Sequence, residues 1–328
     1  MNPRNSVLAV GLGALLLTCL PRAEAQTTGV YDSRKLIAER VRLESRVREL
    51  WQAMYDRLLN QQERAALAQT KLAFPSIMPD NTLLNFYADS GRATMFMPIH
   101  SLLLLEDACT AYAWLYHNGF SFITINEFAA MLKHRSPAGF EGGRYPAPLV
   151  ALGIPNNALS DTRVNDLSLR FRNSAFAYAL GHEAGHILHR HPGNSSVSPA
   201  ESKAHELQAD DFALRVMQRD NEIPMGAILF FQITAFTASP GRFDYSTEEE
   251  WRMAIKSATH PINSERLRGV ASILRSGSVQ YGANRVTAVE VSDKLMKISA
   301  EMDDRDWHLY YKQIGLSAPL SRLKPRTR

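Results

Sequence analysis

The sequence AFAYALGHEAGHILHRH, which runs from Ala175 to His191, contains an H-E-x-x-H motif inside an apolar helical pattern. On an α-helix, residues four positions apart share a face, so the imidazoles of His182 and His186 can bind one metal ion. Glu183 projects beside that ion, where a carboxylate can take a proton from a coordinated water molecule. The alternative is a helix that carries these histidines on its surface. Because the turn before the motif is apolar, we expect the helix to be buried instead.

The third ligand separates the classes of site that share this motif. In the pattern H-E-x-x-H-x-x-G-x-x-H the third ligand is a histidine, but here His189 replaces the glycine and Pro192 replaces that histidine. Downstream, the helical stretch ELQADDFALRVM carries Glu206 and Asp210 one turn apart. Glu206 can be the third zinc ligand, and Asp210 can accept the free ring N–H of a ligating histidine. The alternative is that both carboxylates belong to an ordinary solvated helix face.

A further candidate lies in the segment Thr259-His260-Pro261, which is followed by Arg266. Hydrolysis of a carbonyl group produces an oxyanion that needs a hydrogen-bond donor, and His260 is the candidate for that role. The alternative is that His260 only marks the start of a helix.

Taken together, H-E-x-x-H, E-x-x-A-D and T-H-P-x-x-x-x-R resemble the HtpX and CAAX-prenyl-protease-like zinc metallopeptidases, which are gluzincins. The resemblance implies one zinc ion per chain, a general base and a residue near the substrate: His182, His186 and Glu206 for the zinc, Glu183 for the base and His260 for the substrate. It also implies an α+β, predominantly helical fold, in which a long N-terminal helix precedes a zincin-like domain with a small sheet or hairpin packed on the active-site helix. The transmembrane helices of that family are absent, so the chain resembles a soluble exported branch.

The first residues have the three parts of a signal peptide. Arg4 supplies the positive charge, Val7 to Leu20 is an apolar run too short to span a bilayer, and Ala23-Glu24-Ala25 is a small-x-small cleavage site. We therefore expect cleavage before Gln26 and a periplasmic or secreted protein.

Composition excludes several other classes of protein. The 328 residues are 45% hydrophobic and 21% charged, which is enough to bury a full core and too apolar for disorder. The net charge of +4 is spread along the chain, so we expect no nucleic-acid partner, and no apolar run is long enough for a membrane span. With two cysteines, Cys19 and Cys109, no disulfide framework is expected.

The expected organisation has four parts: a signal peptide (1–25), an N-terminal amphipathic helix (26–75), a zinc metallopeptidase domain (76–312) and a basic tail (313–328). Apolar residues three and four apart predict one helix over Tyr31 to Ala73. Asn85 to Pro98 predicts a small hairpin, whose segment Thr94 to Pro98 is a candidate strand for pairing with substrate. Ser101 to Tyr116 predicts a buried helix, since it is apolar nearly all round.

The resulting hypothesis is an extracytoplasmic zinc endopeptidase that acts on proteins or peptides, in protein quality control. Phage-exclusion proteins and transcription-factor-cleaving regulators share the first two motifs, and only the T-H-P segment and the signal peptide separate this chain from them. The alternative function is a zinc-stabilised periplasmic chaperone or adaptor with a latent site. In that case His189, His191 or His205 would occupy the fourth position on the zinc ion.

Overall fold

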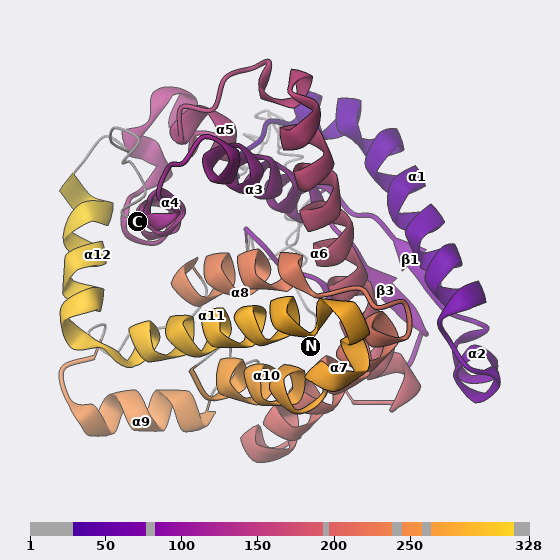
Figure 1. The fold of residues 1–328 in the computed structure, drawn as a ribbon. Helices are drawn as coiled ribbons and strands as arrows, with labels where there is room; N and C mark the ends of the chain where they lie inside the picture. Colours follow the sequence, from indigo (N-terminus) through magenta and orange to yellow (C-terminus); the bar gives the residue numbers. More distant parts are fainter. Residues whose placement is uncertain (1–28, 77–82, 193–196, 238–244, 258–263, 318–328) are drawn as a thin grey trace, which may run out of the picture.

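Helices dominate the architecture, and a small three-stranded sheet lies beside them (Figure 1). The computed structural model describes residues 29–76, 83–192, 197–237, 245–257 and 264–317. The α-helices are α1 (Ser33–Arg57), α2 (Gln61–Leu67), α3 (Ile99–His117), α4 (Ile123–His134), α5 (Pro148–Ala151), α6 (Thr162–Leu188), α7 (Pro199–Arg219), α8 (Met225–Thr237), α9 (Glu248–Ser257), α10 (Ser264–Ser276), α11 (Arg285–Asp303) and α12 (Arg305–Ser317). The other elements are the strands β1 (Lys71–Ala73), β2 (Tyr87–Asp89) and β3 (Thr94–Phe96) and the 3-10 helices η1 (Pro137–Gly139), η2 (Glu141–Gly143), η3 (Ala158–Ser160) and η6 (Ser278–Asn284). The α+β, predominantly helical class predicted from the sequence is confirmed.

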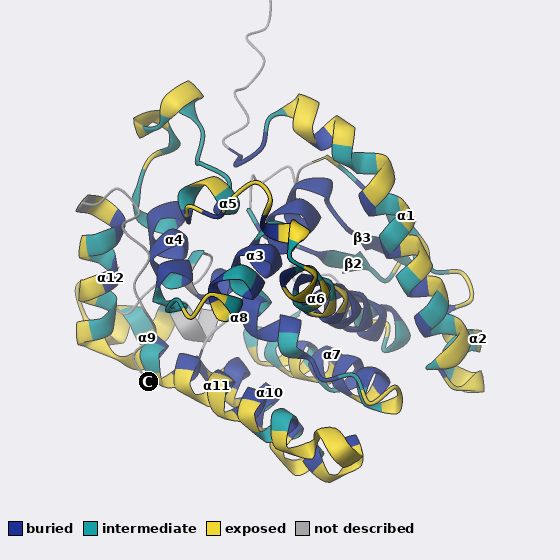
Figure 2. Cartoon of the chain, turned by 45° about the horizontal axis from the view of Figure 1, so that its top comes forward, coloured by how far each residue is buried: buried dark blue, intermediate teal, exposed yellow. Residues whose placement is uncertain are grey.

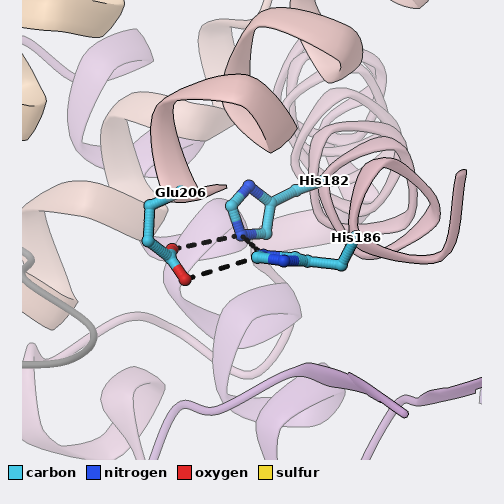
Figure 3. Close-up of side chains that lie close together, drawn as sticks. All are labelled: His182, His186 and Glu206. Atoms are coloured by element: carbon cyan, nitrogen blue, oxygen red, sulfur yellow. Dashed lines mark hydrogen bonds and ion pairs between the residues drawn. The ribbon is translucent and has the colours of Figure 1, made fainter. Parts of the chain in front are cut away.

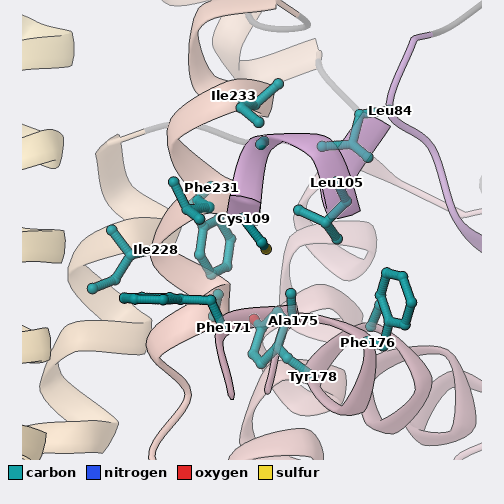
Figure 4. Packing of buried hydrophobic residues seen from close by; sticks show 14 of the residues in the cluster. Leu84, Leu105, Cys109, Phe171, Ala175, Phe176, Tyr178, Ile228, Phe231 and Ile233 are labelled. Carbon is teal, nitrogen blue, oxygen red and sulfur yellow. The ribbon is translucent and has the colours of Figure 1, made fainter. Parts of the chain in front are cut away.

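Helix α6 is enclosed by α3, α7 and α8, and every residue from Ser174 to Gly185 is buried (Figure 2). Tyr178 of α6 packs its ring against Phe231 of α8, and the Cys109 thiol of α3 lies in the same interior (Figure 4). Burial raises the pKa of this thiol, which is fully enclosed. The expected burial of both helices is therefore confirmed, for α6 over its second half and for α3 over most of its length.

The N-terminal segment is divided, although one helix was expected over Tyr31 to Ala73. Helix α1 ends at Arg57, and Asn60 then starts α2 with a capping box: its side chain accepts a hydrogen bond from the Glu63 backbone at 3.0 Å, while Glu63 accepts one from the Asn60 backbone at 2.8 Å. Such a box favours a new helix start. The end of the segment is the strand β1, which pairs with β3, so distant pairing overrides local helical periodicity there.

The sheet has the order β1-β3-β2, with β1 parallel and β2 antiparallel to the central strand β3. The expected hairpin over Asn85 to Pro98 is confirmed as β2 and β3. It lies against α6, where the Ser90 hydroxyl donates a hydrogen bond to the His186 carbonyl at 3.0 Å. The prediction that Thr94 to Pro98 pairs with substrate is wrong, because both edges of β3 are already occupied.

The predicted ends of the chain are described only in part. Residues 1–25, the expected signal peptide, lie outside the described residues, as does the tail beyond Ser317. Helix α12 continues past the expected domain boundary at 312, and the Gly315 carbonyl accepts a hydrogen bond from Arg135 Nε at 2.6 Å. None of the described helices combines the length and the apolar character needed to cross a membrane.

Helices α6 and α7 cross at an unusually short distance, which two glycines make possible. A Cβ atom on Gly181 would lie 3.0 Å from the Cα atom of Ala213, and one on Gly185 would lie 2.9 Å from that of Ala209. Since both partners are alanines and the contacts are to backbone, neither helix can yield by moving a flexible side chain.

We predict that Gly185→Ala lowers the free energy of unfolding by about 1–3 kcal/mol, the usual cost of adding a methyl group to a filled interior. This loss outweighs the gain of about 1 kcal/mol that alanine brings in helix propensity. Urea unfolding of the purified protein measures the change. Gly139→Ala is the control, because its Cβ would meet nothing within 4 Å. Equal stability of Gly185→Ala and wild type would contradict a close crossing.

Candidate metal centre

Two helices supply the residues of the H-E-x-x-H motif and of the acidic stretch that follows it. His182 and His186 lie one turn apart on α6, and Glu206 lies on the facing side of α7. Helix α7 begins at a capping box formed by Ser198 and Glu201, with a proline at its first position. These signals fix the start of the helix and therefore the turn on which Glu206 stands.

The three side chains converge on one point (Figure 3). The Nε2 atoms of His182 and His186 are 3.1 Å apart; Oε2 of Glu206 lies 3.4 Å from Nε2 of His182, and Oε1 of Glu206 lies 3.6 Å from Nε2 of His186. One ligand atom from each residue lies within 4.8 Å of the others. In a tetrahedral zinc site, bonds of about 2.0–2.2 Å place neighbouring ligand atoms roughly 3.3–3.6 Å apart. The spacing and the nitrogen and oxygen donors therefore fit a zinc ion.

Asp210 lies behind the His182 ring, at the position predicted from the sequence. Its carboxylate is 2.8 Å from His182 Nδ1 and is completely buried, one turn along α7 from Glu206. A carboxylate at Nδ1 keeps the proton of the neutral ring on that nitrogen, so Nε2 is left to bind a metal ion.

Two residues to which the sequence assigned no role hold this carboxylate. The Tyr178 hydroxyl donates a hydrogen bond to Asp210 at 2.6 Å, and Arg266 donates two hydrogen bonds to it at 2.8 Å. Arg266 also contacts Glu206 at 2.7 Å, so one buried guanidinium bridges Glu206 and Asp210 of α7. The only sequence signal for this bridge is the arginine that ends the T-H-P-x-x-x-x-R pattern.

The charges of the site favour a cation at the convergence point. Burial alone would raise the pKa of Asp210, but Arg266 and His182 outweigh it and hold that pKa well below its usual range. Burial alone would lower the pKa of His182, yet Asp210 and Glu206 raise it to about 10. Burial, together with the nearby His182 ring, lowers the pKa of His186 to about 2, so its imidazole is neutral, which is the form that binds metal.

The remaining predicted residues have different outcomes. Glu183 is buried on α6, next to His182 in the chain. His260 lies outside the described residues. The Nδ1 atom of His191 is 2.9 Å from Nδ1 of His186, so it lies at the ring edge opposite the one that faces the other two ligands. Among the residues that the structure describes, the converging group does not include His189, His191 or His205.

Comparison with known proteins gives one match. Residues 154–284 match the family model described as Peptidase U49, a stretch that includes α6, α7 and most of the chain that builds the site. The match indicates a peptidase. No curated protein and no solved structure matches the chain.

The match also corrects the resemblance to the HtpX and CAAX-prenyl-protease-like enzymes, because it is to a different peptidase family. The physical reason is that two histidines one turn apart on a helix and a carboxylate on a facing helix are one general way to build a metal site. Families that share this geometry therefore share both motifs, and the motifs alone do not separate them.

We predict that Asp210→Asn lowers the free energy of unfolding of the metal-free protein by about 3–5 kcal/mol, since it leaves the buried Arg266 charge with less compensation. The carboxylate stabilises the fold fully above its unfolded pKa of about 3.9, and this stability is lost as the pH falls towards the depressed folded value. The difference between the variant and wild type should therefore shrink in acid.

Denaturant unfolding with a chelator present, at pH 7 and at pH 3–4, measures both effects. Asp211→Asn is the matched control, because this neighbouring carboxylate pairs only at the surface with Arg215, at 2.8 Å. Such a pair contributes about 0.5 kcal/mol. A loss in Asp210→Asn no greater than in the control would show that the buried pairing contributes nothing.

Proposed function

We propose that the protein is a zinc-dependent endopeptidase that acts outside the cytoplasm. The match to Peptidase U49 supports peptide-bond hydrolysis, and the convergence of His182, His186 and Glu206 at zinc-ligand spacing is the observation that carries the metal dependence. We also infer a zincin-like arrangement, which is supported by the buried H-E-x-x-H helix beside a small mixed sheet.

Each residue of the site has a defined task in this reaction. A zinc ion held by the three ligands would polarise the scissile carbonyl and make the attacking water more acidic. Glu183 takes the proton from that water and transfers it to the leaving amine. His260 donates a hydrogen bond to the oxyanion of the tetrahedral intermediate, a contact whose loss typically costs about 3 kcal/mol of barrier.

The residues behind the ligands keep the site ready for this chemistry. Asp210 orients the His182 ring, and Arg266 holds one oxygen of Glu206 at 2.7 Å. Because Arg266 holds Oε2, we infer that Glu206 binds the metal through Oε1, which lies 3.6 Å from Nε2 of His186.

The location and substrate class complete the proposal. The signal-peptide pattern in residues 1–25 supports a periplasmic or secreted enzyme. Proteins or peptides are the substrates, and protein quality control is the proposed role.

We predict that Glu183→Gln binds one zinc ion per chain like the wild type but cleaves casein or an unfolded protein at least about 100-fold more slowly, because the general base is lost. Zinc content by elemental analysis and proteolysis of the same preparations measure the two properties. Glu206→Gln is the companion variant and should lose the zinc ion as well. Chelation should abolish wild-type cleavage, and added zinc should restore it.

Cleavage by Glu183→Gln at the wild-type rate would overturn the assigned mechanism. Wild-type protein that binds zinc but cleaves nothing would favour the chaperone or adaptor function instead. Wild-type cleavage that resists chelation would overturn the metal dependence.

We also predict that the protein recovered from the periplasm or medium of an expressing bacterium begins at Gln26. Signal peptidase requires small residues at the cleavage site, so Ala25→Leu should block processing. N-terminal sequencing and intact mass give the result. An uncleaved protein that stays in the cytoplasm would contradict export.

A further inference from the structure

At the end of α6 the chain reverses direction and returns toward the metal centre. The backbone N–H of His191 donates to the His186 carbonyl at 3.0 Å, and that of Arg190 donates to the Ile187 carbonyl at 3.1 Å. These two bonds form a Schellman motif, in which the residue after the cap takes a left-handed conformation. Arg190 has that conformation, with φ of 54°, although glycine adopts it at lower cost. The turn places the His191 side chain beside the His186 ring.

A chain of hydrogen bonds begins at that contact. His191 Nδ1 is 2.9 Å from His186 Nδ1, and His191 Nε2 is 2.9 Å from the side-chain oxygen of Gln208 on α7. The Gln208 amide nitrogen is in turn 3.1 Å from Nδ1 of His189. His191 is itself buried and stacks on His205, with ring centroids 4.1 Å apart. Ring stacking and two hydrogen bonds therefore fix the His191 imidazole in one orientation.

The direction of these bonds follows from the metal centre. If His186 binds zinc through Nε2, its proton is on Nδ1 and is donated to His191 Nδ1. His191 then carries its own proton on Nε2 and donates it to the Gln208 oxygen. Since the side-chain oxygen of Gln208 accepts this hydrogen bond, its amide nitrogen donates the next one to His189. Each hydrogen bond of the chain then has one donor and one acceptor, and all run from His186 towards His189.

We propose that His191 is a positioning residue for the metal centre, which orients the His186 ring and fixes its tautomer, and that Gln208 fixes the tautomer of His191 in turn. This inference rests on the proposed zinc site. His191 would thus accept the Nδ1 proton of His186 as Asp210 accepts that of His182, but His191 is a neutral imidazole and Asp210 is a carboxylate. Support of this kind typically changes metal affinity by about 10–100-fold.

The test measures zinc affinity by chelator competition in the purified full-length mature protein. His191→Phe keeps a ring that can stack on His205 but removes the acceptor, so the zinc dissociation constant should rise about 10–100-fold. His191→Asn keeps an acceptor near the position of Nδ1 and should retain most of the affinity. His205→Phe is the matched control and should bind zinc like the wild type, because His205 Nδ1 has no hydrogen-bond partner among the described residues.

Gln208 provides a second test that does not disturb the buried ring, since its own side chain is exposed. Gln208→Leu should weaken zinc binding and Gln208→Glu should strengthen it, because a carboxylate is the better acceptor for His191. The added charge of Gln208→Glu also attracts a divalent cation directly, so the imidazole tautomers separate the two effects. Nitrogen-15 NMR of the imidazoles in zinc-loaded protein should show the proton on Nδ1 of His186 and on Nε2 of His191.

The outcomes separate this inference from the proposed function. Wild-type protein that binds no zinc would overturn both. Wild-type protein that binds zinc, together with unchanged affinity in His191→Phe and in both Gln208 variants, would overturn the inference alone. If His191→Phe does not fold, as judged by circular dichroism with the metal chelated, the Gln208 pair and the NMR tautomers decide.

Discussion

The close crossing of α6 and α7 determines where the three candidate ligands, His182, His186 and Glu206, lie relative to one another. Gly181 and Gly185 face Ala213 and Ala209, and there is no room between the backbones for a further methyl group. Each glycine directly precedes a histidine of the H-E-x-x-H motif, so the crossing brings both imidazoles to the acidic face of α7. A Cβ atom at either glycine would lie 2.9–3.0 Å from the backbone of α7, closer than van der Waals contact, so the helices would have to separate and the ligand atoms would move with them. The small residues that let the helices pack closely are therefore also what brings the candidate ligands together.

Charge balance is the second constraint. Glu206 and Asp210 bring two buried carboxylates to the site, and Arg266 neutralises only part of their charge. In the metal-free protein this excess negative charge raises the pKa of His182 to about 10, because the carboxylates stabilise the protonated ring. A proton on His182 and a divalent cation at the convergence point would each offset the same excess of negative charge. The arrangement thus explains why Glu206 and Asp210 are stable although both are buried.

The parts that the sequence predicted are those set by local periodicity. Helical spacing of four residues places His182 with His186 and Glu206 with Asp210, so each pair could be assigned without a structure. Tyr178 and Arg266 were not assigned their roles, because their contacts with Asp210 join segments 32 and 56 residues away in the chain. The strand β1 was missed for a similar reason, since its pairing with β3 is not a local preference. The break before α2 does follow a local signal, the capping box of Asn60 and Glu63. The family was misassigned because short motifs that follow the spacing of metal ligands do not identify one peptidase family, and the chain matches a different one.

The buried thiol of Cys109 has a practical consequence. It is completely enclosed between α3, α6 and α8, so an alkylating reagent reaches it only when these helices separate. Among the described residues it is the free cysteine, so its rate of labelling reports directly on how often this interior opens. Oxidants in the surrounding medium have no access to it while the helices remain packed. The rate at which a reagent labels Cys109 therefore measures transient opening of the helices in the native protein, without an engineered label.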